Sequence, residues 1–237
     1  MAFPKLTTPT YELEVPSTDE KIKYRPFLVR EEKILLMALE SGETKDIINA
    51  VKDIVTECTF GKVDLGTLPM FDVEYIFLNI RAKSVGEVST LRLLCPDDGE
   101  TYAEVEVDLS KILVQVEKDH NSKIELTDEM GMIMTYPNID SMVNTGITDI
   151  TASNMLDVIG TCILQIYDKD GEEVFETKDQ TKKEISEFIE SLNTKQFQDV
   201  QKFFDTMPKL KHEVELENPK TGVKSKVVLQ GLNDFFA

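Results

Sequence analysis

Cysteine and histidine are scarce in this 237-residue chain, which has three cysteines, two histidines and no tryptophan. Cys58, Cys95 and Cys162 lie far apart, and no CxxC pair occurs. Neither a disulfide framework nor a zinc site finds enough ligands at the usual spacings. The thiols are therefore predicted to be reduced and mostly buried, and no metal or cofactor is expected.

Long apolar runs and basic charge are also missing. No apolar stretch approaches the roughly 20 residues that span a bilayer, and the first residues lack the basic start and apolar block of a secretory signal. The formal net charge of −18 repels nucleic acid and anionic lipid. We therefore expect a protein that is cytosolic where it is made and that binds neither nucleic acid nor membrane.

Recognisable catalytic motifs do not occur either. The GxGxxG, Walker and HExxH patterns are absent, and His120 and His212 have no nucleophile motif beside them. The turn that starts at Asp168 resembles the beginning of a calcium loop, but its glycine is misplaced. No catalytic, cofactor-binding or metal-ligating residue is assigned, and no small-molecule substrate is expected.

The stretch richest in apolar residues, Pro69–Cys95, is the one around which the chain is organised. At 3.6 residues per turn, residues 69–83 form a helix with two apolar faces, separated by polar stripes that include Asp72. Because a surface helix needs only one apolar face, this helix is predicted to be covered on two sides. The two faces comprise Met70, Val73, Phe77 and Ile80, and Phe71, Tyr75, Leu78 and Ala82.

Periodicity elsewhere predicts an α+β fold, with amphipathic helices around this central buried helix and short antiparallel β-hairpins. The methionine row at Met130, Met132 and Met134 is interpreted as core packing, with an adaptable contact surface as the alternative. A capping box at Thr181–Glu184 predicts a helix start. The expected helices cover 27–40, 47–58, 155–166, 185–192 and 197–208, and the expected hairpins cover 11–24, 91–107 and 211–230.

We expect two regions, residues 1–136 with the central helix and the first long hairpin, and residues 137–237, a helical region that ends in the second. A single compact domain is the alternative. The two hairpins share a pattern of strand, proline-containing turn with glycine, and strand, in LRLLCPDDGETYAEVEVDL and VELENPKTGVKSKVVLQGL. The pattern leaves an internal duplication open.

Several segments resemble the base-plate protein family of T-even-like contractile-tailed phages, which contains a baseplate hub subunit and a related hub-assembly protein. FDVEYIFLNIRAKS is the most specific run, and the resemblance covers nearly the whole chain. Some relatives have cysteine pairs in the hairpin turns, whereas only Cys95 is present here. The segments are KIKYRPFLVREEKILL at Lys21–Leu36, TFGK at Thr59–Lys62, LPMFDVEYIFLNIRAKS at Leu68–Ser84, CPDDGE at Cys95–Glu100 and NPKTGVKSKVVLQGLNDFF at Asn218–Phe236.

This resemblance implies a non-enzymatic structural or assembly role in the baseplate hub of the virion tail, with assembly in the host cytoplasm. Its partners would be other hub or tail proteins, with the tape-measure protein and self-association left open. The family offers no catalytic residues to transfer. The alternatives are a tail or tape-measure chaperone that is absent from the mature virion, and a small enzyme with an unrecognised site.

Three apolar residues, Leu232, Phe235 and Phe236, crowd the last six positions, where a chain terminus normally frays. They either dock on the protein's own core or bind a hub or tape-measure partner. These residues are the candidate partner-binding site.

Overall fold

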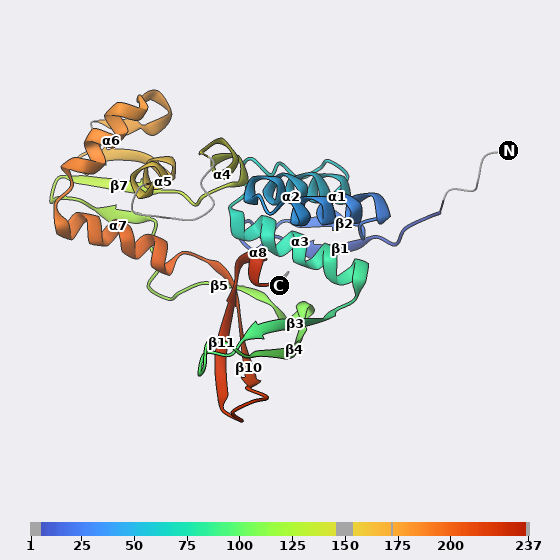
Figure 1. Ribbon diagram of the computed structural model, residues 1–237. Coiled ribbons are helices and arrows are strands. Elements are labelled where there is room, and N and C mark those ends of the chain that lie inside the picture. Colours follow the sequence, from blue (N-terminus) through green and yellow to red (C-terminus); the bar gives the residue numbers. More distant parts are fainter. Residues whose placement is uncertain (1–5, 146–153, 172, 236–237) are drawn as a thin grey trace. The chain divides into compact units, whose positions relative to one another are not determined.

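The computed structural model describes residues 6–145, 154–171 and 173–235 and has the predicted α+β architecture (Figure 1). The chain divides into two compact units, unit 1 formed by Met1–Gln115 with Lys209–Ala237, and unit 2 formed by Val116–Pro208. This division does not coincide with the expected boundary at residues 136 and 137. The C-terminal hairpin belongs to unit 1 because its first strand pairs with a strand at residues 113–115.

Unit 1 combines the long helices α1, α2 and α3 and the short helix α8 with three small antiparallel sheets. The sheets are β1–β2, β3–β4 and β11-β10-β5, and all three predicted hairpins are confirmed. The elements are β1 Tyr11–Glu14, β2 Lys21–Tyr24, α1 Val29–Ser41, α2 Thr44–Cys58, α3 Met70–Val85, β3 Val88–Leu94, β4 Tyr102–Asp108, the 3-10 turn Leu109–Lys111, β5 Leu113–Gln115, β10 Lys209–Glu217, β11 Lys224–Gln230 and α8 Gly231–Asp234.

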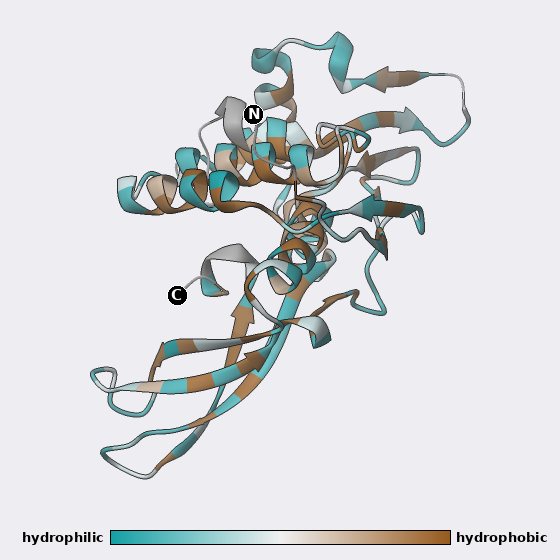
Figure 2. Cartoon of the chain, turned by 90° about the vertical axis from the view of Figure 1, so that its right-hand side faces the viewer, coloured by the Kyte–Doolittle hydropathy of each residue, from teal (hydrophilic) through white to brown (hydrophobic). Residues whose placement is uncertain are grey.

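Helix α3 is the predicted central helix, and it is buried on two sides. Leu78 and Ala82 belong to a core cluster with residues of the two long hairpins, whereas α2 packs along α3 as well. Val73, Phe77 and Ile80 are fully buried. Apolar and polar residues alternate along the hairpin strands (Figure 2), so each strand gives one face to this core. Gly86, with φ 118°, ends the helix.

Asp72 corrects one detail of the prediction, because it was assigned to a polar stripe and is instead fully buried. Its carboxylate accepts hydrogen bonds from the backbone N–H of Ser17, at 3.2 Å, and from the Ser17 hydroxyl. Burial raises the pKa of Asp72, and the Ser17 hydrogen bonds oppose this rise. The pair fixes the β1–β2 turn to the first turn of α3, where the helix dipole favours a negative charge.

Unit 2 contains one antiparallel sheet, in the order β6-β7-β8-β9. Its core includes Met132 and Met134, as predicted for the methionine row, whereas Met130 is partly exposed. The predicted capping box is present, since Thr181 and Glu184 bond each other's backbone N–H. The elements are β6 Lys123–Glu125, β7 Met130–Met134, α4 Ile139–Thr145, α5 Met155–Cys162, β8 Ile163–Asp168, β9 Val174–Glu176, the 3-10 turn Thr177–Asp179, α6 Lys182–Ser191 and α7 Thr194–Thr206.

The predicted helix 155–166 is wrong in its second part, because α5 ends at Cys162 and β8 begins at Ile163. Strand β8 pairs with β7 on one side and β9 on the other, and this pairing outweighs the helical spacing of the apolar residues. The sequence also predicts a cap for this helix near residues 149–151, which lie outside the described residues. Among the helices that are described, none has the length and apolar character of a membrane span.

Candidate functional site

In unit 1 the turns of the two long hairpins meet through the side chain of Asp97. Its carboxylate accepts hydrogen bonds from Nδ2 of Asn218, at 3.0 and 3.1 Å, and from the hydroxyl of Thr221, at 2.6 Å. These hydrogen bonds, from Thr221 first and then Asn218, hold the pKa of Asp97 below its usual value. We call Asp97, Asn218 and Thr221 the turn clamp, since it joins segments more than 120 positions apart.

The two turns also share their backbone geometry. In each, the N–H of a glycine with positive φ bonds to the carbonyl four residues earlier: Gly99 to Cys95 at 3.0 Å, and Gly222 to Asn218 at 2.8 Å. A side-chain oxygen inside each turn, from Asp98 or Asn218, then accepts backbone N–H groups of the following residues. The similarity between the hairpins therefore extends from sequence pattern to geometry, and the duplication stays a prediction.

A zinc ribbon places metal ligands at the first and fourth positions of two such turns. Here those positions hold Cys95 and Asp98 in one turn and Asn218 and Thr221 in the other. Burial, reinforced by Asp97 and Asp98, raises the pKa of the Cys95 thiol and so disfavours the thiolate that zinc requires. Within the described ranges no three His, Cys, Asp or Glu side chains are grouped as metal ligands. The clamp joins the turns by hydrogen bonds.

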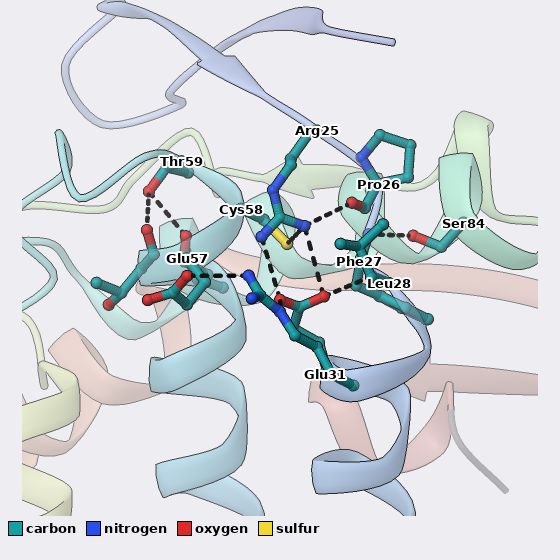
Figure 3. Close-up of polar contacts among 12 residues, drawn as sticks. Arg25, Pro26, Phe27, Leu28, Glu31, Glu57, Cys58, Thr59 and Ser84 are labelled. Atoms are coloured by element: carbon teal, nitrogen blue, oxygen red, sulfur yellow. Dashed lines mark hydrogen bonds and ion pairs between the residues drawn. The ribbon is translucent and has the colours of Figure 1, made fainter. Parts of the chain in front are cut away.

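A second polar cluster in unit 1 surrounds Arg25 (Figure 3). Its guanidinium pairs with the buried carboxylate of Glu31 at 3.1 Å and donates to the carbonyl of Pro26 at 3.0 Å. Glu31 also accepts from the backbone N–H of Leu28, so it caps the start of α1. Burial alone would raise the pKa of Glu31, but hydrogen bonds from Arg25 and Arg30 outweigh it and lower the pKa.

This Arg25 cluster joins β2, α1, α2 and α3. The backbone N–H of Arg25 bonds to the carbonyl of Cys58 at the end of α2, and the N–H of Phe27 bonds to the hydroxyl of Ser84 near the end of α3. Arg25 and Glu31 were not singled out from the sequence. The only signal was a glutamate three residues after Leu28, the spacing of a helix cap. Their arrangement is that of a structural joint.

The buried thiols of Cys58 and Cys162 are poor nucleophiles. Burial raises the pKa of Cys58 to about 11, although Arg25 opposes the shift, and burial raises the pKa of Cys162 in unit 2 to about 12. A thiol with such a pKa carries almost no thiolate near neutral pH. The structure supports the interpretation of Cys58 as an inert core thiol.

In unit 2, His120 is held by both ring nitrogens. Nδ1 lies 3.0 Å from the hydroxyl of Thr206, and Nε2 lies 2.9 Å from the hydroxyl of Tyr136. Because the Thr206 hydroxyl donates to the carbonyl of Lys202, it accepts from Nδ1–H, and Nε2 accepts from Tyr136. The ring also packs on Phe203, and burial lowers its pKa. This neutral histidine links the loop before β6 to the end of α7.

The candidate partner-binding residues are described only in part. Phe235 is fully buried in the core cluster that contains Leu78 and Leu229, so in this structure it docks on the protein's own core. The side chain of Leu232 and all of Phe236 lie outside the described residues. A role for these three residues in partner binding stays a prediction.

Comparison with known proteins places nearly the whole chain in one family. The model of the family described as T4 bacteriophage base plate protein matches residues 8–237. No curated protein and no solved structure matches the chain. The match includes both units, the turn clamp and the Arg25 cluster.

Proposed function

The chain belongs to the T4 bacteriophage base plate protein family, and we propose that it is a non-enzymatic structural or assembly component of the baseplate hub. The match over residues 8–237 is the observation that carries this proposal. It covers residues of both compact units.

The polar groups of both units support a non-enzymatic role. The turn clamp and the Arg25 cluster use their polar atoms to join elements of unit 1. His120 uses both ring nitrogens to join elements of unit 2. Groups that are committed to structural hydrogen bonds are poor candidates for proton transfer or nucleophilic attack.

The proposed partners are other hub or tail proteins, and the proposed location is the tail baseplate, assembled in the host cytoplasm. Small sheets with outer strands suit this role, since outer strands accept strands of another chain. In unit 1 the outer strand β11 is seven residues long and exposes Val228. Of the candidate C-terminal residues, Leu232 and Phe236 remain the proposed contact for a hub or tape-measure protein, whereas Phe235 is buried in the core of unit 1.

Mass spectrometry of separately purified heads, tails and tail-assembly intermediates tests the proposal. A stoichiometric signal in finished tails identifies a hub subunit. A signal confined to assembly intermediates identifies an assembly factor, including a tape-measure chaperone. Co-purification with heads alone, or with no phage component in an infected cell that expresses the protein, contradicts the proposal.

A further inference from the structure

Helix α1 carries apolar residues on the side that faces away from the core. Its core side buries Glu31, Leu35 and Ala38. The opposite side carries Val29, Leu36 and Met37, whose exposed fractions are 80%, 53% and 59%. At about 100° per residue, these three positions fall within an arc of about 100°. They form a second apolar stripe, separate from the face that packs on α2.

Two opposite charges lie on the same stripe. Lys33 follows Val29 by one turn, and Glu40 follows Leu36 by one turn, and both are exposed. They are separated by about 10 Å along the helix axis, which places them on either side of Leu36 and Met37. Neither forms an ion pair within the part of the chain that the structure describes. We call Val29, Lys33, Leu36, Met37 and Glu40 the outer stripe of α1.

We propose that the outer stripe binds the outer stripe of a second copy of this chain, with the two α1 helices antiparallel. The two copies are related by a two-fold axis that passes between Leu36 and Met37. Each Lys33 then lies opposite Glu40 of the second copy, and each Leu36 packs on Met37 of that copy. A parallel arrangement would place Lys33 against Lys33 and Glu40 against Glu40, which is repulsive. The sequence of the stripe is thus complementary to itself in one orientation.

The contact is small, because each copy contributes a single helix face. Stable interfaces bury roughly 1,200–2,000 Å² in total, and one helix pair gives less. The dimer is therefore weak, with a dissociation constant in the micromolar range. Several copies held in one assembly would raise the effective concentration and favour the pairing.

Sedimentation analysis of the full chain from about 5 to about 500 µM tests the pairing. We expect a monomer–dimer equilibrium in the wild type. Lys33→Glu and Glu40→Lys should each raise the dissociation constant about tenfold or more, because each places like charges opposite one another twice. The double variant, Lys33→Glu with Glu40→Lys, should have a dissociation constant within about threefold of the wild-type value, because the reversed pairs attract again.

Matched controls carry the same charge changes at exposed positions away from α1. Lys224→Glu on β11 and Glu20→Lys before β2 should leave the dissociation constant unchanged. Leu36→Asp should abolish the dimer, with circular dichroism melting as the check that this variant folds. If it does not fold, the charge-swap series decides alone.

Three results would overturn the proposal. The first is a wild-type chain that stays monomeric up to about 500 µM. The second is a dimer that a folded Leu36→Asp variant still forms. The third is a double charge swap that fails to restore pairing lost in the single variants. None of these results bears on whether the protein is found in phage tails, so failure here is distinct from failure of the proposed function.

Discussion

Units 1 and 2 are assembled from the chain in different ways. Unit 1 is assembled from both ends of the chain, since β5 at Leu113–Gln115 pairs with β10 at Lys209–Glu217. Unit 2 is one continuous segment, Val116–Pro208, with a sheet whose strands pair in chain order. Unit 1 therefore depends on contacts between the two ends of the chain, whereas the sheet and core of unit 2 lie within a single segment.

The joints of unit 1 show what this difference requires. The Ser17–Asp72 pair and the turn clamp tie together elements that are far apart in the sequence, and the Arg25–Glu31 pair ties the end of β2 to the start of α1. Hydrogen bonds of this kind add directional contacts to an apolar core that alone would tolerate several packings. We therefore expect single polar substitutions in unit 1 to alter how its helices and strands pack together.

The largest expected effect comes from the centre of unit 1. Phe77→Asp should prevent unit 1 from folding, because an unpaired charge would occupy a fully buried position on α3. Truncating a buried phenylalanine already costs about 3–5 kcal/mol, a large share of typical stability. Soluble yield and circular dichroism melting measure the effect.

The matched control is Val85→Asp, at an exposed position near the end of the same helix. This variant should fold and melt close to the wild type. A Phe77→Asp variant that melts like Val85→Asp would refute the burial of α3 on two sides.

Dividing the chain at the unit boundary tests the comparison itself. The isolated segment 116–208 should fold with a cooperative melt, because its sheet and core are contained within it. The isolated segment 1–115 should not, because it lacks Leu210, Val214 and Leu229 from its core. Adding residues 209–237 as a separate peptide should restore structure to segment 1–115. If the two isolated segments both melt cooperatively, or neither does, the proposed difference between the units is contradicted.

Much of this organisation could be predicted from the sequence. The hairpins and the two-sided burial of α3 follow from periods of 2 and 3.6, which are local properties of the chain. The boundary between α5 and β8 was missed because Ile163 and Ile166 satisfy both a helical stripe and a central strand.

The unit boundary, the turn clamp and the Arg25 cluster could not be predicted, because each depends on contacts between segments that sequence spacing does not relate. Asp72 is the clearest case among single residues. Its carboxylate is buried only because Ser17, 55 positions earlier, supplies two donors. Its place on α3 alone indicated a solvent-facing residue.

A smaller effect is expected at the turn clamp, and it should depend on pH. The folded pKa of Asp97 is lowered below the unfolded value of about 3.9, so its stabilisation is complete above that pH and is lost as the pH falls through the lowered pKa. Asp97→Asn should therefore reduce the denaturant midpoint more at about pH 6 than at about pH 2.5.

The control for the clamp is Glu100→Gln, since Glu100 forms only a long, exposed ion pair of 4.0 Å with Lys220. It should leave the midpoint nearly unchanged at pH values near neutrality. If Asp97→Asn lowers the denaturant midpoint by the same amount at both pH values, the charge of the Asp97 carboxylate is not what holds the turns together.

At the same two turns, removing metal is expected to have no effect on stability. Because hydrogen bonds join them, adding a metal chelator should not move the melting curve of the purified protein. Cys95→Ser should fold normally. A chelator-dependent fall in the melting temperature, or stoichiometric zinc in the purified protein, would contradict this reading of the clamp.

The most direct test of the account's central claim, a role in building the baseplate hub, is an infection by phage that lacks this gene. Electron microscopy of the lysate should show completed heads without complete baseplates, and the wild-type gene supplied from a plasmid should restore infectious particles. Normal tails with complete baseplates in the absence of the protein would contradict the claim.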